Sequence, residues 1–190
     1  MRVVILARWP EPGKCKTRLI PAIGPAAAAR LHRTLAEHTV SVARQSRLQF
    51  ELWGTGADEQ AFHDWLGPLK FAPQPAGDLG DKLRAASEPH PVIFLGTDAP
   101  DLTPDLLQSA AYALEQHPAV IGPAEDGGYW TLGLRRPVDG VFTDIPWGTG
   151  TVYKTTLSAF EAAGTIPHVL PTLADLDRPE DLYRWPHLLA

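Results

Sequence analysis

The sequence predicts an α/β sandwich built on a mostly parallel, mixed sheet. Short apolar, β-branched runs alternate with helical stretches along the chain, and no linker, repeat or low-complexity tract divides it. At 190 residues, one domain spanning residues 1–190 is expected.

Residues 3–7 form a continuous apolar run, which is typical of a strand buried on both faces. Residues 25–47 are rich in alanine and repeat apolar residues at helical spacing, with Gly24-Pro25 as the helix entry. The next expected elements are a strand at 48–53 ended by Gly54, a helix at 58–66 capped by Asp58, a weak strand at 70–72 and a helix at 79–87.

Residues 92–95 are the clearest internal strand. The run Thr103-Pro104-Asp105 then supplies an N-cap, a first-turn proline and an early acid for a helix to about residue 116. The remaining expected elements are strands at 119–121 and 129–134, a helix from Thr149 or Thr151 to about 163, an edge strand at 169–170 and a last helix capped by Asp177.

Composition excludes several classes of protein. The chain has 17 basic and 22 acidic residues, so its net charge of −5 argues against a nucleic-acid partner. One cysteine excludes a disulfide framework, and no apolar run approaches the roughly 18 residues of a membrane span. The apolar run at residues 3–7 is too short for a signal peptide, so a cytoplasmic protein is expected.

A basic loop follows the first strand. Four of the 17 basic residues fall within residues 8–18, beside Pro12 and Gly13. Because ligands bind at the carboxyl ends of strands in such sheets, these cations and backbone N–H groups predict a phosphate site. A solvated basic turn is the alternative. The loop is not a Walker A motif, because Cys15 follows Lys14 in place of Ser or Thr.

Two acidic loops follow later strands. Asp98 stands at the tip of the strand 92–95, where a carboxylate suits Mg²⁺ or Mn²⁺ together with substrate phosphates. Asp101 and Asp105 are also explained by turn and helix-start chemistry. The loop 122–130 holds Asp126 and two glycines that permit close backbone approach, although Asp-Gly is also a turn signal. Together the three loops predict a metal-dependent enzyme acting on an activated phosphate compound.

Ordered motifs resemble a bacterial family of nucleotide-diphospho-sugar transferase-like proteins. They are Pro12-Gly13-Lys14-Cys15-Lys16-Thr17-Arg18-Leu19, Gly77-Asp78-Leu79-Gly80, Gly96-Thr97-Asp98-Ala99-Pro100-Asp101-Leu102, Gly122-Pro123-Ala124-Glu125-Asp126-Gly127-Gly128-Tyr129, and Asp175-Leu176-Asp177 with Glu180-Asp181-Leu182. Members are commonly described as glycosyltransferases, some linked to arsenosugar biosynthesis. The superfamily also contains the molybdenum-cofactor and phospholactate guanylyltransferases. The resemblance implies a GT-A fold, a Rossmann-like α/β/α sandwich.

The resemblance also implies site roles. Nucleotide binding is expected at Ala7, Arg8, Pro12, Gly13, Lys14, Lys16, Thr17, Arg18, Gly77, Asp78 and Gly80. Asp98 is the expected ligand of Mg²⁺ or Mn²⁺, and Asp98, Asp126 and Lys16 are the expected catalytic residues. The sugar or acceptor is expected at Asp101, Gly127, Gly128, Tyr129 and Trp147, although Trp147 at a helix entry also suits the core.

Two residues depart from the family pattern. Asp98-Ala99-Pro100-Asp101 is not the Asp-x-Asp of typical GT-A glycosyltransferases, and Arg8 stands where lysine is commoner. Cys15 lies between two lysines, which could lower its pKa, but a small loop residue is the simpler interpretation.

Two reactions therefore remain open. The first is transfer of a sugar from a nucleotide-sugar to a small acceptor, and the second is transfer of NMP from an NTP to a phosphorylated acceptor. A nucleotide-binding protein without activity is a third hypothesis, which the presence of Asp98 disfavours. Asp98→Ala is expected to abolish metal-dependent turnover with little loss of stability.

Overall fold

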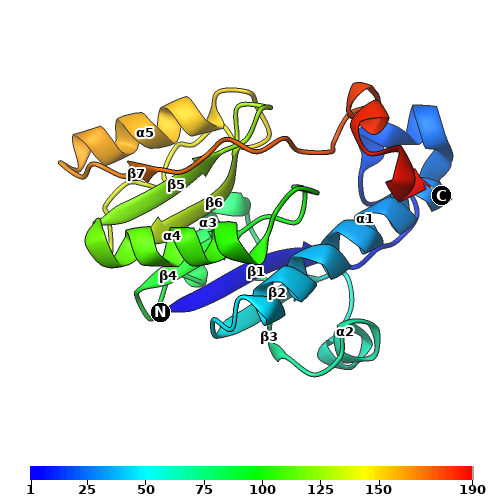
Figure 1. The fold of residues 1–190 in the computed structure, drawn as a ribbon, viewed down its shortest axis with the longest axis horizontal. Coiled ribbons are helices and arrows are strands. Elements are labelled where there is room, and N and C mark those ends of the chain that lie inside the picture. Colours follow the sequence, from blue (N-terminus) through cyan, green and yellow to red (C-terminus); the bar gives the residue numbers. More distant parts are fainter. Residues whose placement is uncertain (190) are drawn as a thin grey trace.

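The computed structural model describes residues 1–189 and confirms the predicted fold class, a mostly parallel mixed sheet between two layers of helices (Figure 1). The strands are β1 (Arg2–Arg8), β2 (Phe50–Thr55), β3 (Lys70–Pro73), β4 (Val92–Leu95), β5 (Ala119–Pro123), β6 (Tyr129–Leu134) and β7 (His168–Val169). The α-helices are α1 (Ile20–Gln45), α2 (Glu59–Leu66), α3 (Leu79–Ala85), α4 (Pro104–Gln116) and α5 (Val152–Ala162). Short 3₁₀ helices are η1 (Thr17–Leu19), η2 (Pro179–Arg184) and η3 (Pro186–Leu189).

The strand order β3-β2-β1-β4-β6-β5-β7 determines where a ligand can bind. From β1 the chain moves outward through β2 and β3, then returns to place β4 on the other side of β1. Crossover loops therefore diverge between β1 and β4, at the switch point where α/β sheets usually bind ligands. Among the strands of residues 1–189, only β6 runs antiparallel to both of its neighbours, β4 and β5.

Alternate strand residues pack into two cores, one on each face of the sheet. Val3 and Ile5 of β1 join the core under α1, α2 and α4, whereas Val4 joins the core that includes Leu83 of α3 and Phe160 of α5. This alternation is the period-2 pattern of a strand buried on both faces.

A third cluster joins the two ends of the chain. Leu19 and Leu31, at η1 and α1, pack against Leu176 and Trp185 of the C-terminal segment. In Figure 1 this segment runs from β7 across the molecule to the first turns of α1. The C-terminal segment therefore lies beside the loop that follows β1.

Several predicted boundaries differ from the observed ones. Helix α1 starts at Ile20, and Gly24 interrupts it with φ 77° before Pro25. Gly54 lies inside β2 instead of ending it, and an added Cβ there would lie 2.5 Å from the Phe71 ring, so the packing favours glycine. Asp58 caps α2 as predicted, since its side chain accepts from Ala61 N.

The predicted last helix is two 3₁₀ segments, and its predicted cap is wrong. The carboxylate of Asp181, not that of Asp177, accepts from the backbone N–H groups of Asp177 and Arg178. The Asp177 carboxylate instead lies beside the basic side chains of Lys16 and Arg18. Within residues 1–189, no helix combines the length and apolar character needed to cross a membrane.

Candidate functional site

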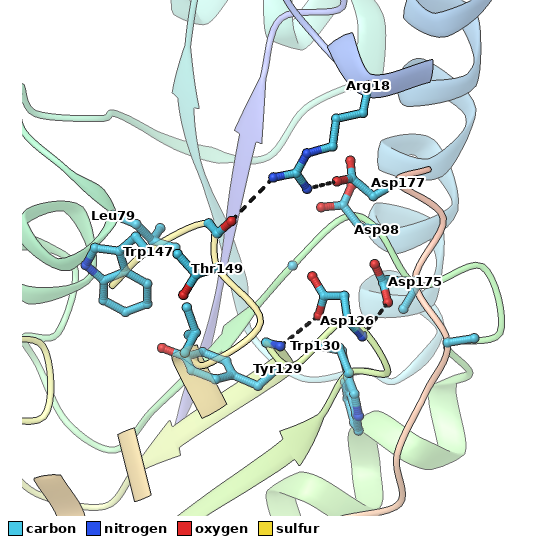
Figure 2. A pocket seen from close by; sticks show the side chains of 17 residues that line it. Arg18, Leu79, Asp98, Asp126, Tyr129, Trp130, Trp147, Thr149, Asp175 and Asp177 are labelled. Carbon is cyan, nitrogen blue, oxygen red and sulfur yellow. Dashed lines mark hydrogen bonds and ion pairs between the residues drawn. The ribbon is translucent and has the colours of Figure 1, made fainter. Parts of the chain in front are cut away.

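Two cavities meet at the carboxyl ends of β1 and β4. We call the first the cationic cavity; it has a volume of about 300 Å³ and is lined by Leu6, Ala7, Arg8, Lys14, Cys15, Lys16, His32, Thr55, Gln74, Leu79, Lys82, Thr97, Asp98 and Asp177. The acidic cavity, about 270 Å³, includes Asp98, Asp126, Asp175 and Asp177 in its lining (Figure 2). Leu79, Asp98 and Asp177 line both, so the two cavities form one cleft of divided charge.

Lys16 lies at the boundary of the cavities with an unusual backbone. Its φ of 47° is left-handed, a conformation that costs a non-glycine residue roughly 1 kcal/mol. Its side chain is only 3% exposed and its Nζ lies 2.6 Å from Asp98 Oδ1. The same Nζ donates to the carbonyl oxygen of Leu176 and lies 3.6 Å from Asp177 Oδ1. Lys16 therefore joins the β1 loop, the β4 tip and the C-terminal segment.

Asp98 is the carboxylate at the centre of the cleft. It follows β4 directly, and half of its side-chain surface is exposed. Burial raises the pKa of this carboxyl, but the Lys16 ammonium outweighs that effect and holds the pKa below the ordinary 3.8. Asp98 is therefore ionised at neutral pH.

The structure divides the residues predicted to bind a nucleotide. Ala7, Arg8, Lys14 and Lys16 line the cationic cavity. Arg18 lines the acidic cavity instead, where it pairs with Asp177 Oδ2 at 2.5 Å. The predicted residues that line neither cavity are Pro12, Gly13, Thr17, Gly77, Asp78 and Gly80.

The motif at residues 77–80 shapes the start of α3. Asp78 caps the helix by accepting from Asp81 N, and Asp81 accepts in return from Asp78 N. Gly77 has φ 113°, and an added Cβ would lie 2.2 Å from the Asp81 carboxylate. An added Cβ on Gly80 would lie 2.5 Å from the carbonyl oxygen of Phe142. These contacts hold Leu79 where it lines both cavities.

The loop after β5 forms the floor of the acidic cavity. Asp126 Oδ1 accepts from Gly128 N at 2.7 Å, which tightens the turn. Gly127 has φ 88°, and an added Cβ would lie 2.1 Å from the carbonyl oxygen of Gly150. Gly128 lines the cavity, but Gly127 does not. The close approach places the loop beside the start of α5.

The walls of the acidic cavity differ in character. In Figure 2, Asp98, Asp126, Asp175 and Asp177 gather on one side and Leu79, Tyr129 and Trp147 lie on the other. The rings of Tyr129 and Trp147 meet edge to face with centroids 6.4 Å apart. Both residues, which are expected at the sugar or acceptor, therefore line the cavity and also pack against each other.

Asp175 is a carboxylate of this cavity with a raised pKa. Burial, followed by the charge of Asp126, raises its pKa to about 6. Asp126 N donates to Asp175 Oδ1 at 3.3 Å, so the two acids are neighbours. Asp175 therefore changes charge near neutral pH.

Asp101 and Cys15 lie outside the acidic cavity. Asp101 lines neither cavity; its carboxylate accepts from Trp185 Nε1 at 3.0 Å, which fixes the C-terminal segment. Burial raises the pKa of the Cys15 thiol more than Arg8 and Lys16 lower it, which agrees with the simpler interpretation of a small loop residue.

Some cavity residues carry no sequence signal of function. His32, Thr55, Gln74 and Lys82 line the cationic cavity although they lie outside the predicted loops. Lys82 stands one helical turn after Asp78, so a helical projection of residues 79–87 could have found it. Thr55 ends the inner strand β2 and Gln74 follows the edge strand β3, and neither belongs to a local motif.

A divalent cation fits the cleft only where protein carboxylates and substrate phosphates bind it together. Within residues 1–189, no three His, Cys, Asp or Glu side chains group closely enough to hold an ion by themselves. Mg²⁺ and Mn²⁺ commonly use one or two carboxylates plus substrate phosphates. The ionised Asp98, between a cationic cavity and further carboxylates, fits that arrangement.

Solved structures share this fold. A Desulfovibrio desulfuricans protein, provisionally named a nucleotide-diphospho-sugar transferase, is 28% identical with a TM-score of 0.86 over 99% of this chain and 96% of its own. Rv0371c from Mycobacterium tuberculosis is 21% identical, with a TM-score of 0.60 over 98% and 97%. The 4-diphosphocytidyl-2C-methyl-D-erythritol synthase of Anaerococcus prevotii is 12% identical, with a TM-score of 0.63 over 99% and 95%.

These likenesses confirm the predicted resemblance to nucleotide-diphospho-sugar transferase-like proteins and its GT-A-type fold. A search of curated protein sequences gives no significant match. The family model described as "Uncharacterized protein conserved in bacteria (DUF2064)" matches residues 34–149, more than half of the chain, and the protein belongs to that family.

Proposed function

We propose that this protein is a transferase that uses a nucleotide-activated donor, and that it transfers a sugar from a nucleotide-sugar to a small acceptor with the help of a divalent metal. The observation that carries the proposal is the cleft of divided charge, in which Asp98 joins the cationic and acidic cavities at the β1–β4 switch point. The likeness to the D. desulfuricans protein supports the transferase class.

The cationic cavity suits the diphosphate of the donor. Arg8, Lys14 and Lys82 line it and can neutralise phosphate oxygens. Lys16 lies between this cavity and Asp98, where its ammonium can turn to the leaving phosphate as the glycosidic bond breaks.

Asp98 is the proposed ligand of Mg²⁺ or Mn²⁺. Relatives support a divalent metal: Rv0371c has been solved with manganese (18% identity, TM-score 0.54). Glucosyl-3-phosphoglycerate synthase from M. tuberculosis has been solved with Mn²⁺ and UDP (14% identity, TM-score 0.55). When bound, the cation would supply Lewis-acid stabilisation of the diphosphate leaving group.

The acidic cavity suits the sugar and the acceptor hydroxyl. Tyr129 and Trp147 offer aromatic surface, and Asp126 and Asp175 offer hydrogen-bond acceptors opposite it. As the acceptor oxygen bonds to the anomeric carbon, the donor's C–O bond to the diphosphate breaks. The hydroxyl proton passes to a carboxylate of the Asp126–Asp175 pair.

Nucleotidyl transfer is the second candidate. Four positive side chains in one cavity also suit a triphosphate. CMP-2-keto-3-deoxy-manno-octonic acid synthetase, solved with CTP, shares the fold over 98% of this chain (14% identity, TM-score 0.60). In this reaction the acceptor attacks the α-phosphate and pyrophosphate leaves.

A thermal-shift panel distinguishes the two reactions. The protein is heated with nucleotide-sugars, NDPs and NTPs, each with Mg²⁺ or Mn²⁺. A ligand at 100 times its Kd stabilises by about 2.7 kcal/mol, which raises the Tm of a protein of this size by roughly 5–11 °C. Shifts with nucleotide-sugars but not NTPs support glycosyl transfer, and the reverse supports nucleotidyl transfer. No shift with any nucleotide refutes both.

A further inference from the structure

Gln74 lies across the carboxyl ends of three strands at the cationic cavity. It follows β3 directly, and its backbone N–H donates to the carbonyl oxygen of Gly54 at 2.8 Å. Its side-chain Nε2 donates to the carbonyl oxygens of Trp53 at 2.7 Å and of Ala7 at 3.0 Å. One residue thus ties β3 to β2 and β1 where the cavity opens.

These contacts fix the orientation of the Gln74 amide. Nε2 carries two hydrogens, and both face carbonyl oxygens, which only the nitrogen end can satisfy. Among the hydrogen bonds of residues 1–189, none reaches Oε1. Oε1 is also not one of the buried polar atoms that lack a partner in that range. Oε1 is therefore a fixed acceptor without a partner in the described part of the chain, on a residue that lines the cationic cavity.

Neutral residues adjoin Gln74 in the cavity lining. Gln74 contacts Ala7, and Thr55 follows Gly54, its other backbone partner. The positive groups come from the loop after β1 and from α3. If the phosphates of a nucleotide contact those cations, its uncharged base lies beside the neutral residues Gln74, Ala7 and Thr55.

We propose that Gln74 Oε1 accepts a hydrogen bond from an N–H group of the donor's nucleobase and selects the base by that contact. This inference rests on the proposed nucleotide site. The four bases carry N–H groups at different places on their edges, so an acceptor that cannot turn distinguishes them by position. A base that leaves Oε1 unpaired in the closed complex loses affinity, as in other sites built around a hydrogen bond.

The test is calorimetric titration of the full chain with the four ribonucleoside diphosphates and with inorganic pyrophosphate, all with Mg²⁺. We expect one base to bind about tenfold or more tightly than the others, the effect of one neutral hydrogen bond. Gln74→Met should weaken that nucleotide about tenfold and narrow the spread among bases, leaving pyrophosphate unchanged. Gln60→Met on α2, outside both cavities, is the matched control and should change nothing.

Two results would overturn the inference while leaving the nucleotide site intact. One is a wild-type protein that binds all four bases equally. The other is an equal loss for all four in Gln74→Met, which indicates a ribose contact or a loosened loop. If neither nucleotides nor pyrophosphate bind the wild type, the proposed function itself fails.

Gln74→Met also removes two hydrogen bonds to the strands, so a second measurement varies the ligand. The preferred nucleotide is methylated at each base N–H in turn and titrated against the wild-type protein. One methylated form should lose as much affinity as the variant loses for the unmodified nucleotide. Full affinity for every methylated form overturns the inference.

Discussion

Asp98→Ala separates the structural role of the Lys16–Asp98 pair from any role in metal binding. From its place at a strand tip alone, this substitution is expected to cost little stability. The structure contradicts that expectation, because the Lys16 side chain is only 3% exposed and Asp98 is its closest charged partner at 2.6 Å. Without Asp98, the buried ammonium keeps the Leu176 carbonyl oxygen and Asp177 at 3.6 Å.

The magnitude follows from the burial of the two partners. Breaking a fully buried ion pair costs about 3–5 kcal/mol, and breaking an exposed one costs about 0–1 kcal/mol. Lys16 is buried but Asp98 is 52% exposed, and Asp177 compensates in part. We therefore expect a loss of about 1–3 kcal/mol, which lowers the Tm by roughly 2–12 °C for a domain of this size.

The assay is urea unfolding of the wild type, Asp98→Ala, Lys16→Met and the double variant. We expect a coupling energy of about 1 kcal/mol or more, because the double variant removes the buried charge along with its partner. Asp98→Ala as stable as the wild type, or additivity within about 0.5 kcal/mol, would refute the reasoning. Since the pKa of Asp98 is lowered in the folded state, the stability difference should be full above pH 3.8 and shrink as pH falls through the folded pKa.

Three further predictions follow from the cleft. The double variant Lys14→Ala/Lys82→Ala should weaken pyrophosphate binding in calorimetry more than Arg18→Ala does, because Lys14 and Lys82 line the cationic cavity and Arg18 does not. Equal losses of affinity would contradict this assignment of the cations to separate cavities. Asp175→Asn should leave the Tm unchanged near pH 4 and raise it above pH 6, because a carboxyl whose pKa is raised from 3.8 to about 6 destabilises the fold once it is ionised. A Tm difference that does not depend on pH would count against this reasoning. Gly127→Ala should destabilise the fold by more than the roughly 1 kcal/mol expected for Gly140→Ala. Both glycines have positive φ, but only at Gly127 would the added Cβ collide with a backbone oxygen. Equal urea midpoints for the two variants would disprove the steric argument.

The sequence was sufficient to locate the loops of the cleft but not to pair them. Asp98 and the basic loop each follow a buried apolar run, and in a parallel sheet the carboxyl ends of strands share one edge. That β4 adds beside β1, and not beside β3, depends on the packing of helices over the two faces. No local pattern encodes this order, although it determines which loops meet.

Contacts with the C-terminal segment were even less accessible from local patterns. Lys16 and Leu176 are 160 residues apart in the chain, yet Nζ of one bonds the carbonyl oxygen of the other. The Asp-x-x-Glu pattern at residues 177–180 is a sound capping signal, but Asp181 takes the capping role. A propensity rule cannot see that Arg18 competes for the Asp177 carboxylate at 2.5 Å.

The small net charge of −5 conceals a separation that is sharper than the sequence suggests. The basic loop looks like one cluster of four cations, but its backbone turns through a left-handed residue at Lys16. Arg8, Lys14 and Lys16 consequently line one cavity and Arg18 lines the other, while Asp98 and Asp177 lie beside the Lys16 ammonium. Counting charges along the loop therefore overstates the positive charge that the loop offers to a phosphate, and Lys82 of α3 adds a further cation to the same cavity.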